Sequence, residues 1–92
     1  MPIIAAFDHD PDETLDYSID WTDWLPGSDT ISSSDWDVPA GITKETQAAT
    51  TKVATVWLSG GTDGAEYKLT NTITTVAGRT AQRTIQIKVD EK

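Results

Sequence analysis

A strict alternation of apolar and polar residues near the start of the chain constrains the fold more than any other feature. From Leu15 to Trp21 every second residue is apolar, and the residues between them include Asp16, Ser18 and Asp20. A period of two residues is typical of a β-strand with one buried and one solvated face. No stretch sustains the 3.6-residue period of a helix, so the sequence predicts an all-β protein.

Further short strands are predicted along the rest of the chain, separated by turns rich in Gly, Pro, Asp and Ser. We expect them near residues 30–38, 53–58, 67–74 and 85–89, and Ile42 could start another. The last two strands form the clearest hairpin, with Ala77 and Gly78 in its turn. Roughly six or seven short antiparallel strands at intervals of about 8–12 residues favour a β-sandwich over a parallel-sheet fold.

The chain has 92 residues, which is enough for one small domain. We expect residues 1–13 to form an extended acidic N-terminal arm and residues 14–92 to form a single sandwich domain. Ile3, Ile4 and Phe7 make the start of the arm apolar. Two interpretations of this apolar start remain open: it contacts a neighbouring protein, or it is the first strand of the domain's own sandwich.

Cellular location and covalent cross-links are constrained by what the composition lacks. There is no cysteine, which excludes a disulfide framework and suits a protein made in the cytosol. Residues 2–7 are apolar but have no cationic flank, so a signal peptide is not expected. No apolar run approaches the roughly 18–20 residues of a membrane-spanning helix.

The charges are distributed very unevenly along the chain. There are 15 acidic and 7 basic residues, giving a net charge of −8. The segment from Met1 to Asp37 contains no Lys or Arg and carries −10, and the remainder carries +2. Nucleic-acid binding needs clustered Lys and Arg at the phosphates, and anionic membranes attract basic amphipathic helices. Neither nucleic acid nor membrane is therefore expected as a partner.

The acidic segment at residues 8–13 partly matches the pattern of a metal site. Asp8, Asp10 and Asp12 alternate as the first ligands of a calcium loop do. However, Glu13 stands where such a loop needs Gly, and Ile19 stands where it needs a bidentate Glu. We therefore expect a solvated acidic arm and no bound metal.

No catalytic group or cofactor is expected either. His9 is the single histidine, and its neighbours on an extended chain point in other directions, so we expect it in a solvent-facing loop. Asp20 and Asp23 could in principle act as a glycosidase pair, but no cleft is predicted between them. The phase of the strands assigns Trp21, Trp36 and Trp57 to the core, and Trp24 is expected to be the most exposed tryptophan.

Many short strings distributed from Asp10 to Val89 resemble one known family. They are 10–12 (DPD), 15–17 (LDY), 20–21 (DW), 24–25 (WL), 27–31 (GSDTI), 36 (W), 38–42 (VPAGI), 56–61 (VWLSGG), 67 (Y), 70–71 (TN) and 78–80 (GRT). Together they are similar to small virion proteins of tailed bacteriophages, the phage fiber–tail adaptor proteins. The resemblance consists of fold-determining positions and contains no catalytic motif.

The resemblance implies an immunoglobulin-like β-sandwich without catalysis or cofactor. It also implies a symmetric, multi-copy assembly on the virion, near the neck or tail, in contact with other phage structural proteins. Tyr67 would then occupy the position of the tyrosine corner of immunoglobulin-like folds.

Three functions are compatible with these observations. The first is a multi-copy adaptor that links neck or tail components to fibers. The second is a capsid cement or decoration protein, and the third is a glycan-binding module for host recognition that uses Trp24. The candidate partner-binding residues are Ile3, Ile4, Phe7, Trp24, Arg79 and Arg83.

The uneven charge adds one further expectation. The strand at residues 15–21 should present an acidic outer face. That face could contact the side bearing Arg79, Arg83 and Lys88 in a neighbouring copy, or it could repel packaged DNA. Association through such a contact would weaken with added salt.

Overall fold

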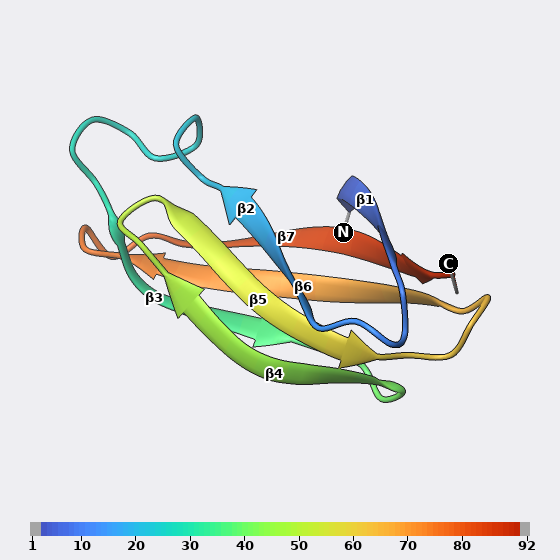
Figure 1. The fold of residues 1–92 in the computed structure, drawn as a ribbon. Helices are drawn as coiled ribbons and strands as arrows, with labels where there is room; N and C mark the ends of the chain where they lie inside the picture. The colour runs from blue at the N-terminus through green and yellow to red at the C-terminus, as the bar shows by residue number, and fades with distance from the viewer. Residues whose placement is uncertain (1–2, 91–92) are drawn as a thin grey trace.

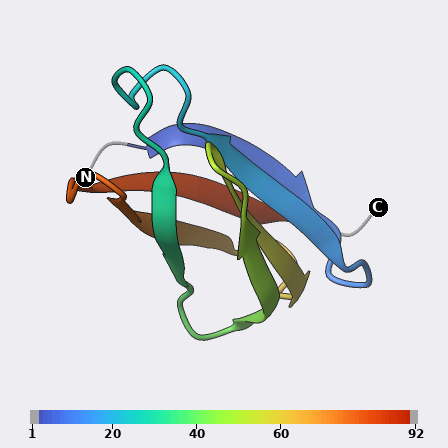
Figure 2. The same cartoon turned by 90° about the vertical axis from the view of Figure 1, so that its left-hand side faces the viewer.

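Seven β-strands arranged in two facing sheets make up the protein. The computed structural model describes residues 3–90 (Figures 1 and 2). The strands are β1 (Ile3–His9), β2 (Leu15–Asp20), β3 (Ile31–Asp37), β4 (Ile42–Ala49), β5 (Val53–Gly60), β6 (Glu66–Thr75) and β7 (Thr80–Val89). The four-stranded sheet has the order β1-β7-β6-β3 and the three-stranded sheet the order β2-β5-β4. The predicted β-sandwich is confirmed.

β1 is the strand whose pairing departs from expectation. It runs parallel to β7, with Phe7 opposite Ile87 and His9 opposite Val89, whereas the other pairs of neighbouring strands are antiparallel. Residues 3–9 of the predicted arm are thus part of the sandwich. Within residues 3–90, no helix has the length and apolarity that crossing a membrane would require.

The order of the strands bears on the immunoglobulin-like connectivity that the sequence suggested. β2-β5-β4 and β7-β6-β3 follow the order of strands B-E-D and G-F-C of an immunoglobulin domain. The geometry at Tyr67, near the start of β6, supports this correspondence. Its hydroxyl accepts a hydrogen bond from the backbone N–H of Thr62 at 3.1 Å, as the hydroxyl of a tyrosine corner bonds to backbone a few residues upstream. The immunoglobulin-like connectivity stays a prediction that both features support.

The core lies between the two sheets, where alternate residues of each strand point inward. Trp21 and Trp36 are almost fully buried, as expected. Eight aliphatic residues of β5, β6 and β7 have no exposed surface: they are Ala54, Val56, Leu58, Leu69, Ile73, Ile85, Ile87 and Val89. Full burial of an aliphatic side chain stabilises the fold by about 1.5–3 kcal/mol.

The assignment of Trp57 to the core was wrong. Trp57 is 38% exposed and lies on the outer face of the three-stranded sheet. Because residues 53–58 form a nearly continuous apolar run, the period alone does not decide which residues face inward. In the fold, Ala54, Val56 and Leu58 take the inward positions, and Trp57 between them must point outward.

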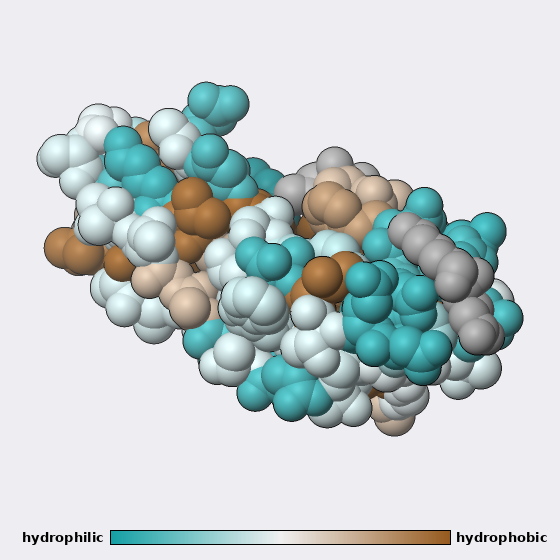
Figure 3. Space-filling view, viewed as in Figure 1, coloured by the Kyte–Doolittle hydropathy of each residue, from teal (hydrophilic) through white to brown (hydrophobic). Residues whose placement is uncertain are grey.

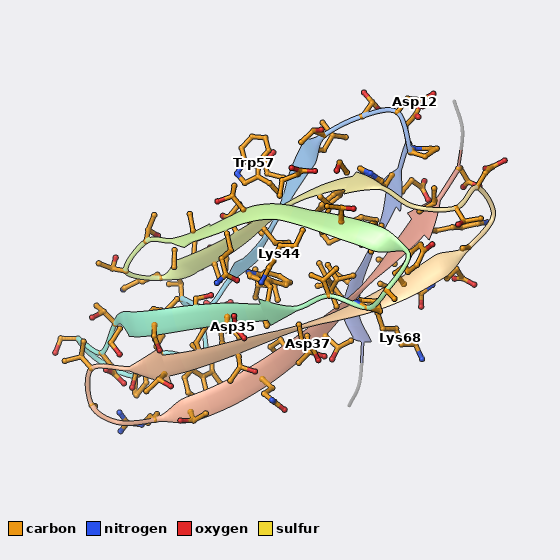
Figure 4. The ribbon with its side chains drawn as sticks, turned by 90° about the horizontal axis from the view of Figure 1, so that it is seen from below. Asp12, Asp35, Asp37, Lys44, Trp57 and Lys68 are labelled. Carbon is orange, nitrogen blue, oxygen red and sulfur yellow. The ribbon has the colours of Figure 1, made fainter. Side chains whose placement is uncertain are left out.

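One side of the sandwich is closed by side chains of β4 that reach the edge of β3. The backbone N–H of Trp36 donates to Oε1 of Gln47 at 2.9 Å, and Nζ of Lys44 donates to the backbone carbonyl of Trp36 at 3.1 Å. Figure 4 shows Lys44 between β4 and β3. Because these bonds occupy edge groups of β3, the side chains of β4 hinder the addition of a foreign strand there.

Candidate partner-binding surfaces

Two loops meet at one end of the elongated sandwich, whose extents are 42 × 23 × 20 Å. They are the β2–β3 loop (residues 21–30) and the β6–β7 turn (residues 76–79), both at the left in Figure 1. We call this surface the loop end. The backbone N–H of Val76 donates to the carbonyl of Thr30 at 2.9 Å, so the two segments are joined through their backbones.

Asp29 holds the loop end together through both of its carboxylate oxygens. Oδ1 accepts from the backbone N–H groups of Thr30 and Ala77, each at 3.0 Å. Oδ2 accepts from the guanidinium of Arg79 at 2.9 Å, and only 5% of the Asp29 side chain is exposed. Because one carboxylate bonds to both loops, it fixes their relative position.

The electrostatics of Asp29 follow from these contacts. Burial by itself raises the pKa of the carboxyl, because it removes water from the charged form. Hydrogen bonds from Thr75, Ala77, Arg79 and Thr30 outweigh burial and hold the pKa of Asp29 below its ordinary value. Asp29 is therefore an ionised structural group, and the donors around it occupy both of its oxygens.

A shallow pocket of about 390 Å³ lies at the loop end. Val76 on its rim is 71% exposed, and Figure 3 shows hydrophobic surface over the β6–β7 turn. The pocket is lined by Pro26, Gly27, Ser28, Asp29, Val76, Ala77 and Arg79. This combination of an exposed aliphatic side chain, backbone groups and one ion pair suits contact with a protein.

Trp24 and Arg79, two of the candidate partner-binding residues, both belong to the loop end. Trp24 is half-buried and was expected to be more exposed. Its ring contacts the ring of Trp21 edge-on, with centroids 5.5 Å apart, and its backbone N–H donates to the carbonyl of Trp21 at 3.0 Å. The turn after β2 thus folds Trp24 back onto the core, which the sequence did not reveal.

Arg83 and Phe7 belong to strands β7 and β1 and make internal contacts. The guanidinium of Arg83 stacks over Trp21, 4.9 Å from the ring centroid. Phe7 is half-buried and its ring contacts Tyr17, with centroids 5.3 Å apart. Ile3 and Ile4 belong to β1, but their side chains lie outside the described residues. Partner binding by these four residues stays a prediction.

The structure does not gather Arg79, Arg83 and Lys88 on one side. Arg79 follows the β6–β7 turn, and Lys88 lies near the other end of the ten-residue strand β7. At about 3.4 Å per residue these two positions are roughly 30 Å apart. Arg83 between them faces inward onto Trp21. A single basic side that could receive the acidic face of another copy is therefore absent from the described strands.

His9 is fully buried, so the expectation of a solvent-facing loop histidine was wrong. β1 continues through residue 9, and its inward phase places the imidazole against Tyr17. Nδ1 of His9 lies 2.8 Å from the hydroxyl of Tyr17. No group of three acidic or histidine side chains in the described part of the chain has the arrangement of a metal site.

The outer face of the three-stranded sheet is a second candidate surface, and Trp57 is at its centre. Asp16 on β2 and Thr46 on β4 lie directly opposite Trp57. We call the outward residues Asp16, Ser18, Asp20, Glu45, Thr46, Thr55, Trp57 and Ser59 the Trp57 face. The strict alternation in β2 indicated its acidic part, and the exposure of Trp57 was missed.

The sequence of the chain matches the model of a known protein family. The model of a family described as Podophage GP4 fiber-tail adaptor protein gp77 matches residues 9–88, which is most of the chain. No curated protein matches the chain. The matched segment runs from the end of β1 to near the end of β7 and includes both candidate surfaces.

Proposed function

Because the chain belongs to the podophage GP4 fiber-tail adaptor protein gp77 family, we propose that it is a non-enzymatic virion protein that connects fibers to the tail. In this proposal several copies are arranged symmetrically at the neck or tail. Each copy binds other phage structural proteins and acts as a rigid spacer between them. The seven-stranded sandwich provides the rigidity, and its loops and outer faces provide the contacts.

The observation that carries the proposal is the fixed position of the loop end. Flexible loops usually lose conformational entropy when they bind a partner protein, and that loss makes the free energy of binding less favourable. Here Asp29 joins the β2–β3 loop to the β6–β7 turn through contacts within the chain. We infer that the loop end is one docking surface. Val76 contributes exposed apolar area, and the contact of Trp24 with Trp21 holds the β2–β3 loop against the core.

The same geometry supports a structural role over a catalytic one. A general acid or base must exchange a proton with a substrate. In the pocket, the carboxylate of Asp29 is bonded to Thr30, Ala77 and Arg79, and its pKa is lowered. Both charged groups of the pocket thus hold the two loops together.

The proposal is tested with phage particles that lack this chain. We expect such particles to have assembled heads and tails but to lose fibers, as seen by cryo-electron microscopy, and to regain them when the protein is supplied. In complete particles its copy number should be comparable with that of the fiber protein. Normal fibers on particles without the chain would contradict the proposal, and so would a copy number close to that of the major capsid protein, which a decoration protein would show.

A further inference from the structure

Trp57 is a large aromatic side chain that the sandwich leaves at its surface. It lies in the central strand of the three-stranded sheet, and Figure 4 shows it on the side of β5 that faces away from the other sheet. Within residues 3–90 the large hydrophobic side chains classed as exposed are Leu15, Trp57 and Val76. Leu15 lies at the start of an edge strand and Val76 in a turn, so only Trp57 is exposed in the middle of a sheet.

One carboxylate lies beside Trp57 and belongs to no ion pair of the described residues. This carboxylate is that of Asp16, directly opposite Trp57 on β2. Asp20 lies on the same face further along that strand, where it interacts electrostatically with Lys52. The ion pairs in the described part of the chain join Arg79 to Asp29 and Lys88 to Asp90. Asp16 belongs to neither pair, and no Lys or Arg precedes residue 44 in the sequence.

The outer face of the four-stranded sheet is different in character. Its central part consists of Thr and Gln side chains that bond to one another across β6 and β7. Thr70 lies 3.1 Å from Thr84 between hydroxyl oxygens, and Nε2 of Gln82 donates to the hydroxyl of Thr72 at 3.0 Å. That face satisfies its own polar groups, whereas the Trp57 face places an exposed aromatic ring beside the carboxylate of Asp16, which belongs to no ion pair of the described residues.

We propose that the Trp57 face docks onto a basic surface of another virion protein, with an arginine stacked on Trp57 and paired with Asp16. This inference rests on the proposed adaptor function and names the chemistry of one partner. A planar guanidinium can stack on an indole ring while its N–H groups bond to a carboxylate. Trp and Arg also contribute a large share of the binding energy at protein interfaces.

Two observations favour a different protein over a second copy of this chain as the partner. The chain has two arginines, and both are engaged: Arg79 pairs with Asp29, and Arg83 stacks on Trp21. The Arg83–Trp21 contact also shows, inside this domain, the geometry that we assign to the interface. The negative charge of residues 1–37 would in addition steer a basic partner towards this side of the molecule.

The first test compares phage particles that carry single substitutions on the two outer faces. Asp16→Asn should leave the melting temperature of the purified chain nearly unchanged, because its side chain points to solvent. Trp57→Ala should lower it only modestly and keep the fold, because Trp57 is 38% exposed and lies outside the core. We expect each to lower the amount of particle-bound chain or fiber by about tenfold or more, as loss of a major interface residue does. Asp37→Asn, which removes a carboxylate from the outer face of the other sheet, is the matched control and should have no effect.

The second test identifies what contacts Trp57 in the particle. A photo-crosslinking amino acid, p-benzoylphenylalanine, replaces Trp57, and the crosslinked peptides of irradiated particles are sequenced by mass spectrometry. We expect a peptide of another virion protein that contains arginine. A crosslink confined to a second copy of this chain would overturn the inference, and so would particles with Trp57→Ala that retain all fibers.

A glycan is the alternative ligand for an exposed tryptophan flanked by carboxylates. Particles with Trp57→Ala that keep their fibers but adsorb poorly to host cells would favour that ligand and overturn the inference. The outcomes also separate this inference from the proposed function. If deletion of the chain removes the fibers but Trp57→Ala does not, only the inference fails; if deletion leaves the fibers in place, the adaptor function itself fails.

Discussion

The carboxylate of Asp29 accepts a hydrogen bond from the guanidinium of Arg79 at 2.9 Å, although the two residues are 50 positions apart in the chain. Asp29 belongs to the loop that follows β2, and Arg79 follows the turn between β6 and β7. The same carboxylate also bonds to the backbone of Thr30 and Ala77. The shape of the loop end therefore depends on one buried acidic group.

Replacing Asp29 should destabilise the protein more than replacing Arg79. Asp29→Ala removes the acceptor that Thr30, Thr75, Ala77 and Arg79 share and leaves the N–H of Ala77 without its partner. Arg79→Ala removes a single donor whose side chain is half exposed. The midpoint of urea unfolding measures both effects. Asp23→Ala, an exposed acid on the same loop, is the control; equal effects of the Asp29 and Arg79 substitutions would contradict the prediction.

Stability should fall in acid because of Asp29. Its pKa is lowered in the folded state, so the folded protein holds this carboxylate ionised at pH values where the unfolded chain begins to bind a proton. The stabilisation is fully present above the ordinary pKa of Asp, near 3.9, and is lost as the pH falls below it. Urea midpoints at pH 6, 4 and 3 should decline less steeply for Asp29→Asn than for the unmodified chain. Parallel declines would show that another group is responsible.

Strands with one solvated face could be predicted well from the sequence. β2 alternates strictly and β6 and β7 alternate over part of their length, and the inward positions of Tyr17, Ile73 and Ile87 follow from that period. The sequence of β4 is ambiguous because just one of its residues, Ile42, is a buried apolar residue. Its place is set by pairing with β5, which is a long-range relationship that local composition does not report.

The candidate surfaces were harder to predict because they depend on phase and on contacts distant in sequence. Trp57 lies in a continuous apolar run, so its outward direction is decided by the packing of Ala54, Val56 and Leu58. His9 was assigned to a loop because the pairing of β1 with the distant strand β7 leaves no signal near residue 9. Arg79 was selected by its charge, but its ion pair with Asp29 bridges two distant turns and has no local signature.

Asn71 should be one of the polar residues most important for stability. It is fully buried, its Oδ1 accepts from the indole N–H of Trp21 at 3.0 Å, and its Nδ2 donates to the hydroxyl of Ser34 at 2.9 Å. Asn71→Leu keeps a similar volume but leaves these buried groups unpaired. We expect a loss of about 3 kcal/mol in the free energy of unfolding, measured with urea. Ser33→Ala, at an exposed position of β3, should change it by less than about 0.5 kcal/mol.

Alkaline pH should destabilise the fold through Tyr17. Burial raises the pKa of its hydroxyl to about 12, and the carboxylates of Glu13, Asp16 and Asp8 add to the effect. In the unfolded chain a tyrosine loses its proton near pH 10, before Tyr17 does so in the folded protein. Ionisation therefore stabilises the unfolded state relative to the folded state as the pH rises. The contribution of Tyr17 is complete below about pH 10 and is lost as the pH rises towards 12. Tyr17→Phe cannot ionise, and its urea midpoint should therefore decline less between pH 9 and 12 than that of the unmodified chain. Because both proteins contain the same lysines, a difference in slope isolates Tyr17, and identical slopes would refute this assignment.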